Sequence, residues 1–261
     1  MVQITPNVMP VYTYTGNHQM IDDGNGHWRI KFLSSGVLEW LSPDTSIDVF
    51  LVGGGAAGVY MKSQYYYNGG GGGYTKTVKQ QKLSKNQRIQ ITVGAGGTPD
   101  AWGGAEGGTT KFDSLSAAGG SGASGGSGGG GGDWNSYRRG GHGGTDGANG
   151  ENGYNDSGSV PGGRGQGSTT REFGEPGAEL YSGGGGGGAY GYRNTSSGGS
   201  GGSGSPKLAT SGRSGSDASY NTWAGGGAGG GYGGGGGGTT KPDAQMGSGA
   251  QGIVIIRDAR A

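Results

Sequence analysis

The sequence predicts an all-β protein with essentially no α-helix: an antiparallel, jelly-roll-like β-sandwich that continues into a bundle of polyglycine II helices. The first observation is composition, because glycine supplies 73 of the 261 residues and hydrophobic residues only 29%, too few for an ordinary core of this size. The second is that four glycines fall in residues 1–52, sixteen in 53–110 and fifty-three in 111–252. The third is that apolar, β-type segments lie near the two ends of the chain.

Five short segments near the N-terminus are predicted to be strands, because β-branched and aromatic residues partly alternate in them and turn residues separate them. These segments are residues 28–33, 37–41, 47–52, 74–79 and 88–93. In the last segment Ile89, Ile91 and Val93 share one face and the residues between them share the other. That pattern is typical of an antiparallel strand with one solvated side.

The last apolar segment, IVIIR, lies more than 150 residues further on, at 253–257. A continuous apolar run suits a central strand that is covered on both faces. We expect this strand to return and pair beside residues 47–52, so that both ends clamp the glycine region. The predicted division is a β-sandwich formed by residues 1–110 and 253–261, with the glycine bundle in residues 111–252.

The glycine region suits neither an α-helix nor collagen. Glycine costs about 1 kcal/mol relative to alanine in a helix interior, and collagen needs glycine at every third residue with abundant proline, whereas this chain has eight prolines. Disorder is the alternative that this composition usually indicates. Polyglycine II is the ordered choice: an extended threefold helix without internal hydrogen bonds, whose amides must pair with neighbouring helices.

Only glycine lets several such helices approach closely enough to exchange main-chain hydrogen bonds on all sides. The sequence therefore predicts that the six-glycine runs, 183–188 and 233–238, are the most enclosed helices. Runs with interspersed serine or alanine, such as GGSGASGGSGG, are expected at the edge with their side chains facing outward. Because hydrogen bonds barely offset the entropy of ordering glycine, the bundle needs the β-sandwich to hold its ends.

Aromatic residues make up 9% of the chain, and many stand where glycine runs stop. Four inserts, MKSQYYYN, DWNSYRR, AYGYRNT and SPKLATSGRSGSDASYNTW, combine Tyr, Trp, Arg, Asn and Ser as antibody paratopes do. Turns between helices that run up and down would gather these inserts at the ends of the bundle. The residues predicted to bind a receptor are Tyr65, Tyr66, Tyr67, Trp134, Tyr137, Arg138, Tyr190, Tyr192, Arg193, Tyr220 and Trp223. The alternative for individual aromatics, among them Trp102, Trp134 and Trp223, is that they cap the open ends of the bundle.

Several classes of function fit the sequence poorly. No cysteine is present, the three histidines have no carboxylate at useful spacing, and no nucleophile motif occurs, so we expect no enzyme and no cofactor. GGGAAG after residues 47–52 has the letters of a dinucleotide loop but precedes a poor helix start. Glu172, Glu175 and Glu179 are candidates for Ca²⁺ ligands, although a salt bridge to Arg171 that fixes the loop is the favoured interpretation.

The charge balance and the N-terminus also limit the partners. A net charge of +1 without a long Lys/Arg run argues against nucleic acid. No stretch approaches 18 apolar residues, so no membrane insertion is expected, and the first residues lack the pattern of a signal peptide.

Five stretches, IDVFLVGGG, GGGGGYTKT, ITVGAGG, GQGSTTREFGE and GIVIIR, make the chain resemble glycine-rich proteins encoded among the tail genes of phages and prophages of gut Firmicutes. In architecture it is similar to the tail-fibre tip adhesins of T-even-like phages, whose polyglycine II bundle presents receptor-binding loops, although its N-terminal segment departs from theirs. It is also similar to the glycine-rich extracellular domain of anaplastic lymphoma kinase receptors.

These resemblances imply a phage or prophage tail adhesin, located on the virion, that contacts a bacterial surface glycan or protein. Other tail proteins are expected partners, and a homo-oligomer is possible. The alternative is a structural tail component whose tyrosines mediate assembly with copies of itself or with other virion proteins. Ice binding is a third, less favoured function, because the bulky inserts argue against one flat regular face.

Overall fold

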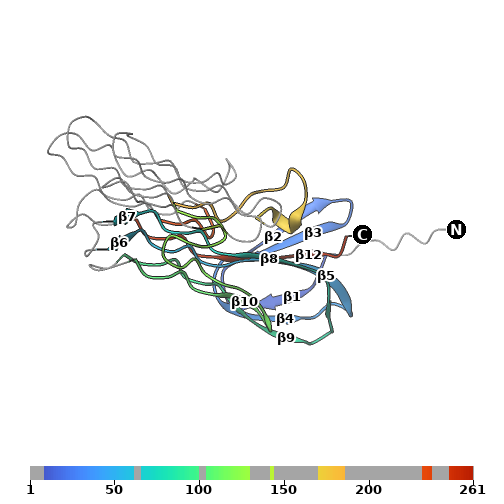
Figure 1. Cartoon of the computed structure of the whole chain (residues 1–261). Helices are drawn as coiled ribbons and strands as arrows, with labels where there is room; N and C mark the ends of the chain where they lie inside the picture. Colours follow the sequence, from blue (N-terminus) through green and yellow to red (C-terminus); the bar gives the residue numbers. More distant parts are fainter. Residues whose placement is uncertain are drawn as a thin grey trace.

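The computed structural model describes residues 9–61, 66–99, 104–129, 142–143, 170–185, 231–236 and 247–260, and of residues 59–61 and 66–67 it describes the backbone alone. A β-sandwich forms one end of the described structure, and extended glycine segments run away from it toward the other end (Figure 1). The described chain begins and ends at the sandwich, where Met9 packs against the core and Arg260 pairs with Asp23. No helix among the described residues has the length and apolar character needed to cross a membrane.

Two five-stranded sheets, in which every strand pairs antiparallel, make up the sandwich. The first sheet has, in spatial order, β1 (Tyr12–Tyr14), β4 (Gly36–Trp40), β9 (Arg88–Thr92), β10 (Thr110–Phe112) and β11 (Leu115–Ala117). The second has β2 (His18–Gly24), β3 (His27–Phe32), β12 (Ile253–Asp258), β5 (Thr45–Val52) and β8 (Thr75–Leu83). A separate hairpin pairs β6 (Val59–Met61) with β7 (Tyr66–Asn68). The helical content of the described chain is one 3₁₀ turn, η1 (Glu172–Gly174), so the predicted all-β class is confirmed.

The prediction for the C-terminal strand is also confirmed. β12 lies between β3 and β5, with Ile255 opposite Phe50, and all six of its residues are buried. Side chains alternate between two apolar clusters: Val254 and Ile256 face the first sheet, whereas Ile253 and Ile255 face the opposite side. A strand with apolar residues on both faces needs a cover on both faces, which explains the continuous apolar run.

The five predicted N-terminal strands correspond to β3, β4, β5, β8 and β9. Ile89 and Ile91 of β9 are buried while Arg88 and Gln90 are exposed, as the alternation predicts. The sequence interpretation missed β1, β2, β6, β7, β10 and β11. All of these except β2 have only three residues, and β2 is a polar edge strand, so tertiary pairing rather than local pattern defines them.

Most strands of the sandwich continue directly into extended glycine segments, which we call rods. The described rods are residues 53–58, 69–74, 94–98, 105–109, 118–122, 125–129, 182–185, 233–236 and 247–252. β5 runs into the first of them, and the last runs into β12. Four rods precede residue 110, whereas β10 and β11 of the sandwich lie at 110–117, so sandwich and bundle alternate along the chain instead of dividing near residue 110.

The hydrogen bonds of the rods repeat every three residues. Along rod 53–58, the first and fourth amides donate to rod 69–74, the second and fifth to rod 105–109, and the third and sixth to rod 247–252. The six N–O distances are 2.8–3.1 Å. A period of three residues is that of the polyglycine II helix, so these contacts identify the rods as such a bundle.

Rod 53–58 holds the central position among the described rods. Its carbonyl groups at 54, 55 and 56 accept hydrogen bonds from rods 118–122, 94–98 and 233–236, which gives it six hydrogen-bonded neighbours. The described parts of the six-glycine runs, residues 183–185 and 233–236, are buried as well. They are nevertheless not the centre of the described array: the rod with six hydrogen-bonded neighbours is 53–58, which leaves the second sheet through β5.

Side chains on the outer rods follow the same period. Exposed positions recur three residues apart, at residues 95 and 98, 106 and 109, and 118 and 121. The expectation that serines of GGSGASGGSGG face outward holds for Ser121 and is wrong for Ser127, which is fully buried. The Ser127 hydroxyl donates to the carbonyl oxygen of Ser182, and this hydrogen bond lets a polar side chain lie inside the array.

Candidate functional site

The rods bring many separate parts of the chain together at the end furthest from the sandwich, which we call the display end. Gly58 donates to the carbonyl oxygen of Gly247, and Gly70 lies between Gly236 and Gly185 through hydrogen bonds of 2.7 and 2.8 Å. These positions border the stretches 62–65, 186–230 and 237–246, which lie outside the described residues. Insertions far apart in the sequence therefore leave the rods at neighbouring points.

The β6–β7 hairpin marks this end in the structure. β6 directly follows the central rod, and β7 leads into rod 69–74, so the hairpin lies beyond the rods, away from the sandwich (Figure 1). Tyr66 pairs with Met61 and Tyr67 with Tyr60 across the hairpin backbone. Two of the predicted receptor-binding residues thus belong to a segment at the display end.

The other predicted receptor-binding residues lie outside the described residues: Tyr65, Trp134, Tyr137, Arg138, Tyr190, Tyr192, Arg193, Tyr220 and Trp223. Trp102, a candidate cap, lies outside them as well. Their assignment stays a prediction. Stretch 186–230 leaves the described rods at Gly185, at the display end, whereas the described chain resumes beside Ser182 and Gln251, near the sandwich.

A second feature is a loop of residues 170–182, here called the clasp, which covers the outer face of the second sheet. Glu172 donates its amide to the carbonyl oxygen of Glu179, and Tyr181 donates to that of Thr170, so the two ends of the loop are joined. Phe173 and Tyr181 are buried against Phe50, with ring centroids 5.9 and 5.3 Å away. The clasp is therefore the apolar cover that β5 and β12 need on their outer side.

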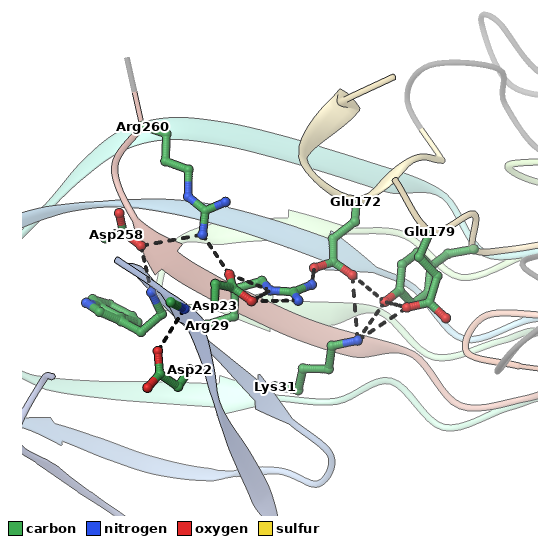
Figure 2. A network of polar contacts seen from close by, with 11 residues as sticks. Asp22, Asp23, Arg29, Lys31, Glu172, Glu179, Asp258 and Arg260 are labelled. Atoms are coloured by element: carbon green, nitrogen blue, oxygen red, sulfur yellow. Dashed lines mark hydrogen bonds and ion pairs between the residues drawn. The ribbon is translucent and has the colours of Figure 1, made fainter. Parts of the chain in front are cut away.

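The clasp is also held by charged side chains of β3, Arg29 and Lys31 (Figure 2). Arg29 lies 2.5 Å from Glu172 and 2.8 Å from Asp23. Lys31, which is only 6% exposed, lies 3.4 Å from Glu179 and 3.6 Å from the second oxygen of Glu172. Each cation therefore neutralises carboxylates that would otherwise be costly to bury.

A third cation, Arg257 of β12, is 1% exposed and lies against Phe173 of η1. It forms ion pairs with Asp48 at 3.1 Å and with Glu175 at 2.7 Å, and its guanidinium carbon lies 4.1 Å from the centroid of the Phe173 ring. The hydrogen bond and positive charge of Arg257 lower the pKa of Glu175. Burial opposes the charge of Arg257, but hydrogen bonds and charge from Glu175 and Asp48 outweigh it and raise its pKa.

The pKa values of two further groups in the network, Asp23 and Tyr181, are shifted by burial and by neighbouring charges. Burial would raise the pKa of Asp23, but hydrogen bonds from Arg29 and Arg260 outweigh it and lower that pKa. Burial, together with the charges of Glu172 and Glu179, strongly raises the pKa of the Tyr181 phenol. The Tyr181 hydroxyl therefore stays protonated and donates to these carboxylates.

This arrangement corrects the interpretation of the three glutamates. Glu172, Glu175 and Glu179 pair with cations of the sandwich, whereas the Arg171 guanidinium donates to the carbonyl oxygen of Ala178. Within the described part of the chain, no group of acidic and histidine side chains is arranged to hold a metal ion. The salt bridges do fix the loop, but their cations come from strands far away in sequence, which local spacing cannot reveal.

The sequence nevertheless contained one signal for these cations. WRIKFL and IVIIRD place Arg29, Lys31 and Arg257 within otherwise apolar strands, on the outward-facing side together with Ile255. A charge on a covered strand requires a partner of opposite sign, and an acidic loop elsewhere in the chain is the natural source.

A sandwich whose strands extend into hydrogen-bonded glycine rods defines the molecule as a glycine-rich β-protein. The chain belongs to the glycine-rich domain family. The model of this family matches residues 33–258, from the residue after β3 to the end of β12. A search of the curated proteins found no significant match.

Proposed function

We propose that the protein is a phage or prophage tail adhesin that binds a bacterial surface glycan or protein through the insertions at its display end. The observation that carries this proposal is the separation of two ends of the described structure: the described chain begins and ends at the sandwich, and the rods run from there to the display end (Figure 1). At that end the described residues border stretches 62–65 and 237–246 and the start of stretch 186–230. Such a molecule attaches by one end and presents side chains with the other.

The chemistry of the insertions supports binding. Rods joined on all sides by main-chain hydrogen bonds form a rigid base, so less entropy is lost when loops mounted on it meet a partner. Tyrosine, tryptophan and arginine are the residues that dominate binding energy at interfaces, and serine and asparagine supply adaptable hydrogen bonds. These residue types are the ones enriched in the four inserts.

The test uses the purified full chain against a glycan array and a panel of bacterial cells. Replacement of Tyr190, Tyr192 and Arg193 by alanine is expected to reduce binding at least tenfold and to change the melting temperature little. The matched control replaces Tyr74 and Arg88, an exposed tyrosine and an exposed arginine of the sandwich region, and is expected to retain binding.

Blocking of phage adsorption by the free protein is the corresponding functional assay. Absence of binding to every cell type and glycan, combined with loss of oligomers or particles in the triple variant, would contradict the adhesin proposal. That result would instead indicate a structural tail component.

A further inference from the structure

The clasp contains a buried amine held against a carboxyl group, with a second carboxyl group connected to both. Lys31 and Glu179 form an ion pair with Nζ and Oε2 3.4 Å apart. The Tyr181 hydroxyl accepts a hydrogen bond from Lys31 at 3.2 Å and lies 2.7 Å from Glu172 and 3.1 Å from Glu179. The hydroxyl group of Tyr181 therefore joins the amine to both carboxylates.

We propose that Lys31 and Glu179 condense to an intramolecular amide, which covalently links the clasp to β3. The bond formed is between Lys31 Nζ and the Glu179 side-chain carbonyl carbon, and the bond broken is from that carbon to Oε2, which leaves as water. No oxidant, reductant or further reactant is needed, because an ammonium and a carboxylate contain every atom of the amide and the water.

The surrounding groups carry the protons. One proton passes from the Lys31 ammonium through the Tyr181 hydroxyl to Glu179 Oε2, which leaves a neutral amine and a carboxylic acid in contact. After the amine attacks, a second proton passes to Glu172 and from there to the same oxygen, so that water leaves and Glu172 is restored. Arg29, 2.5 Å from the other oxygen of Glu172, holds this carboxylate in place.

The site also favours condensation over hydrolysis. Groups held in reactive contact reach effective concentrations of about 10⁵–10⁸ M, far above what two solutes attain in water. Burial acts in the same direction, since the reaction replaces two charges by one neutral amide in surroundings that include Tyr181 and Phe50. Glu179 Oε1, which is buried without a hydrogen-bond partner, becomes the amide oxygen and no longer carries a share of charge.

A covalent link at this position would give the chain a cross-link, which its lack of cysteine otherwise excludes. The link would close a loop of nearly 150 residues between β3 and the clasp. Cross-links across long loops stabilise chiefly by restricting the unfolded chain.

Intact-mass measurement of the folded full chain tests the proposal without any variant. We expect a mass one water molecule, about 18 Da, below that of the sequence. Because succinimide formation at Asp23–Gly24 or Asp146–Gly147 would cause the same loss, trypsin mapping must locate it. The expected product joins the peptide of residues 30–62, uncut at Lys31, to the peptide of residues 172–193.

Three variants separate the amide from an ordinary ion pair. Lys31→Arg keeps the positive charge and Glu172→Gln keeps both reacting groups, and each is expected to show the full sequence mass. Tyr181→Phe, which removes only the connecting hydroxyl, is expected to form the link at least tenfold more slowly. Loss of the link in Lys31→Arg is expected to lower the melting temperature by about 10 °C.

The outcome that overturns the proposal is equally direct. A wild-type chain that is folded, stored at neutral pH and still has its full sequence mass has no amide at this site. A water loss that maps elsewhere, or that persists in Lys31→Arg, leads to the same conclusion.

Discussion

Replacement of Gly55 by alanine tests the central claim that the rods lie too close together for side chains. A methyl carbon at this position would lie 2.0 Å from the carbonyl oxygen of Gly234, whereas ordinary contact begins at 3.4 Å, so the two rods would have to separate by about 1.4 Å. The hydrogen bond that joins these two rods directly runs from Gly236 to the carbonyl oxygen of Ala56 and is 2.9 Å long, and Ala250 donates to the carbonyl oxygen of Gly234 at 2.8 Å. Separation of this size would break them.

The cost follows from these two bonds. Each buried group left without its partner lowers the free energy of unfolding by about 1–3 kcal/mol. Alanine offsets about 0.4–1 kcal/mol of this, because it lowers the conformational entropy of the unfolded chain, so the net loss of stability is about 2–5 kcal/mol. For a chain of this size we expect a melting temperature lower by about 5–15 °C in differential scanning calorimetry. Ala118→Ser is the matched control, since it adds one atom at an exposed rod position and should change stability by less than about 0.5 kcal/mol. If Gly55→Ala and the control have the same melting temperature, close packing of the rods is refuted.

Further predictions concern the clasp. Phe173→Ala removes a buried ring from the cover of the second sheet and is expected to cost about 3–5 kcal/mol in urea unfolding, and a loss below 1 kcal/mol would show that the clasp does not seal this face. Arg257→Met leaves Asp48 buried without its cation and is expected to cost about 3–5 kcal/mol at pH 7; equal stability of variant and wild type at pH 7 would contradict the ion-pair account. The lowered pKa values of Glu175 and Asp23 mean that their ion pairs stabilise the fold above the ordinary carboxyl pKa of about 4, and that this contribution disappears as the pH falls through the lowered values. Glu175→Gln should therefore melt lower than wild type at pH 7 and converge with it in acid, and parallel melting curves across this range would argue against the linkage.

How much of the fold the sequence predicts depends on how locally each feature is encoded. Residues 47–52 and 253–257 are apolar almost throughout, so the sequence alone predicts their pairing at the centre of a covered sheet. Strands such as β10 and β11 carry three residues each and no alternation long enough to recognise. They exist because the neighbouring rods bring their backbones together.

The candidate site divides in the same way. The composition of the inserts indicated recognition, and their placement between glycine runs indicated that they are turns. Which glycine run lies at the centre was not encoded locally, because every glycine residue looks alike. Rod 53–58, which includes Ala56 and Ala57, is central because its amides and carbonyl groups pair with six other rods, and the described parts of the longer glycine runs join the array around it.

The sequence by itself determined that main chain rather than side chain must hold most of this protein together, since glycine leaves only amides and carbonyl groups to pair. It also determined that the apolar ends of the chain must meet, because no other apolar surface is available to bury them. Only the tertiary structure decided which amides pair and that Glu172, Glu175 and Glu179 meet Arg29, Lys31 and Arg257 rather than a metal ion or Arg171. These contacts join residues more than 80 positions apart, and the energy of a contact depends on distance in space, which local sequence pattern does not record.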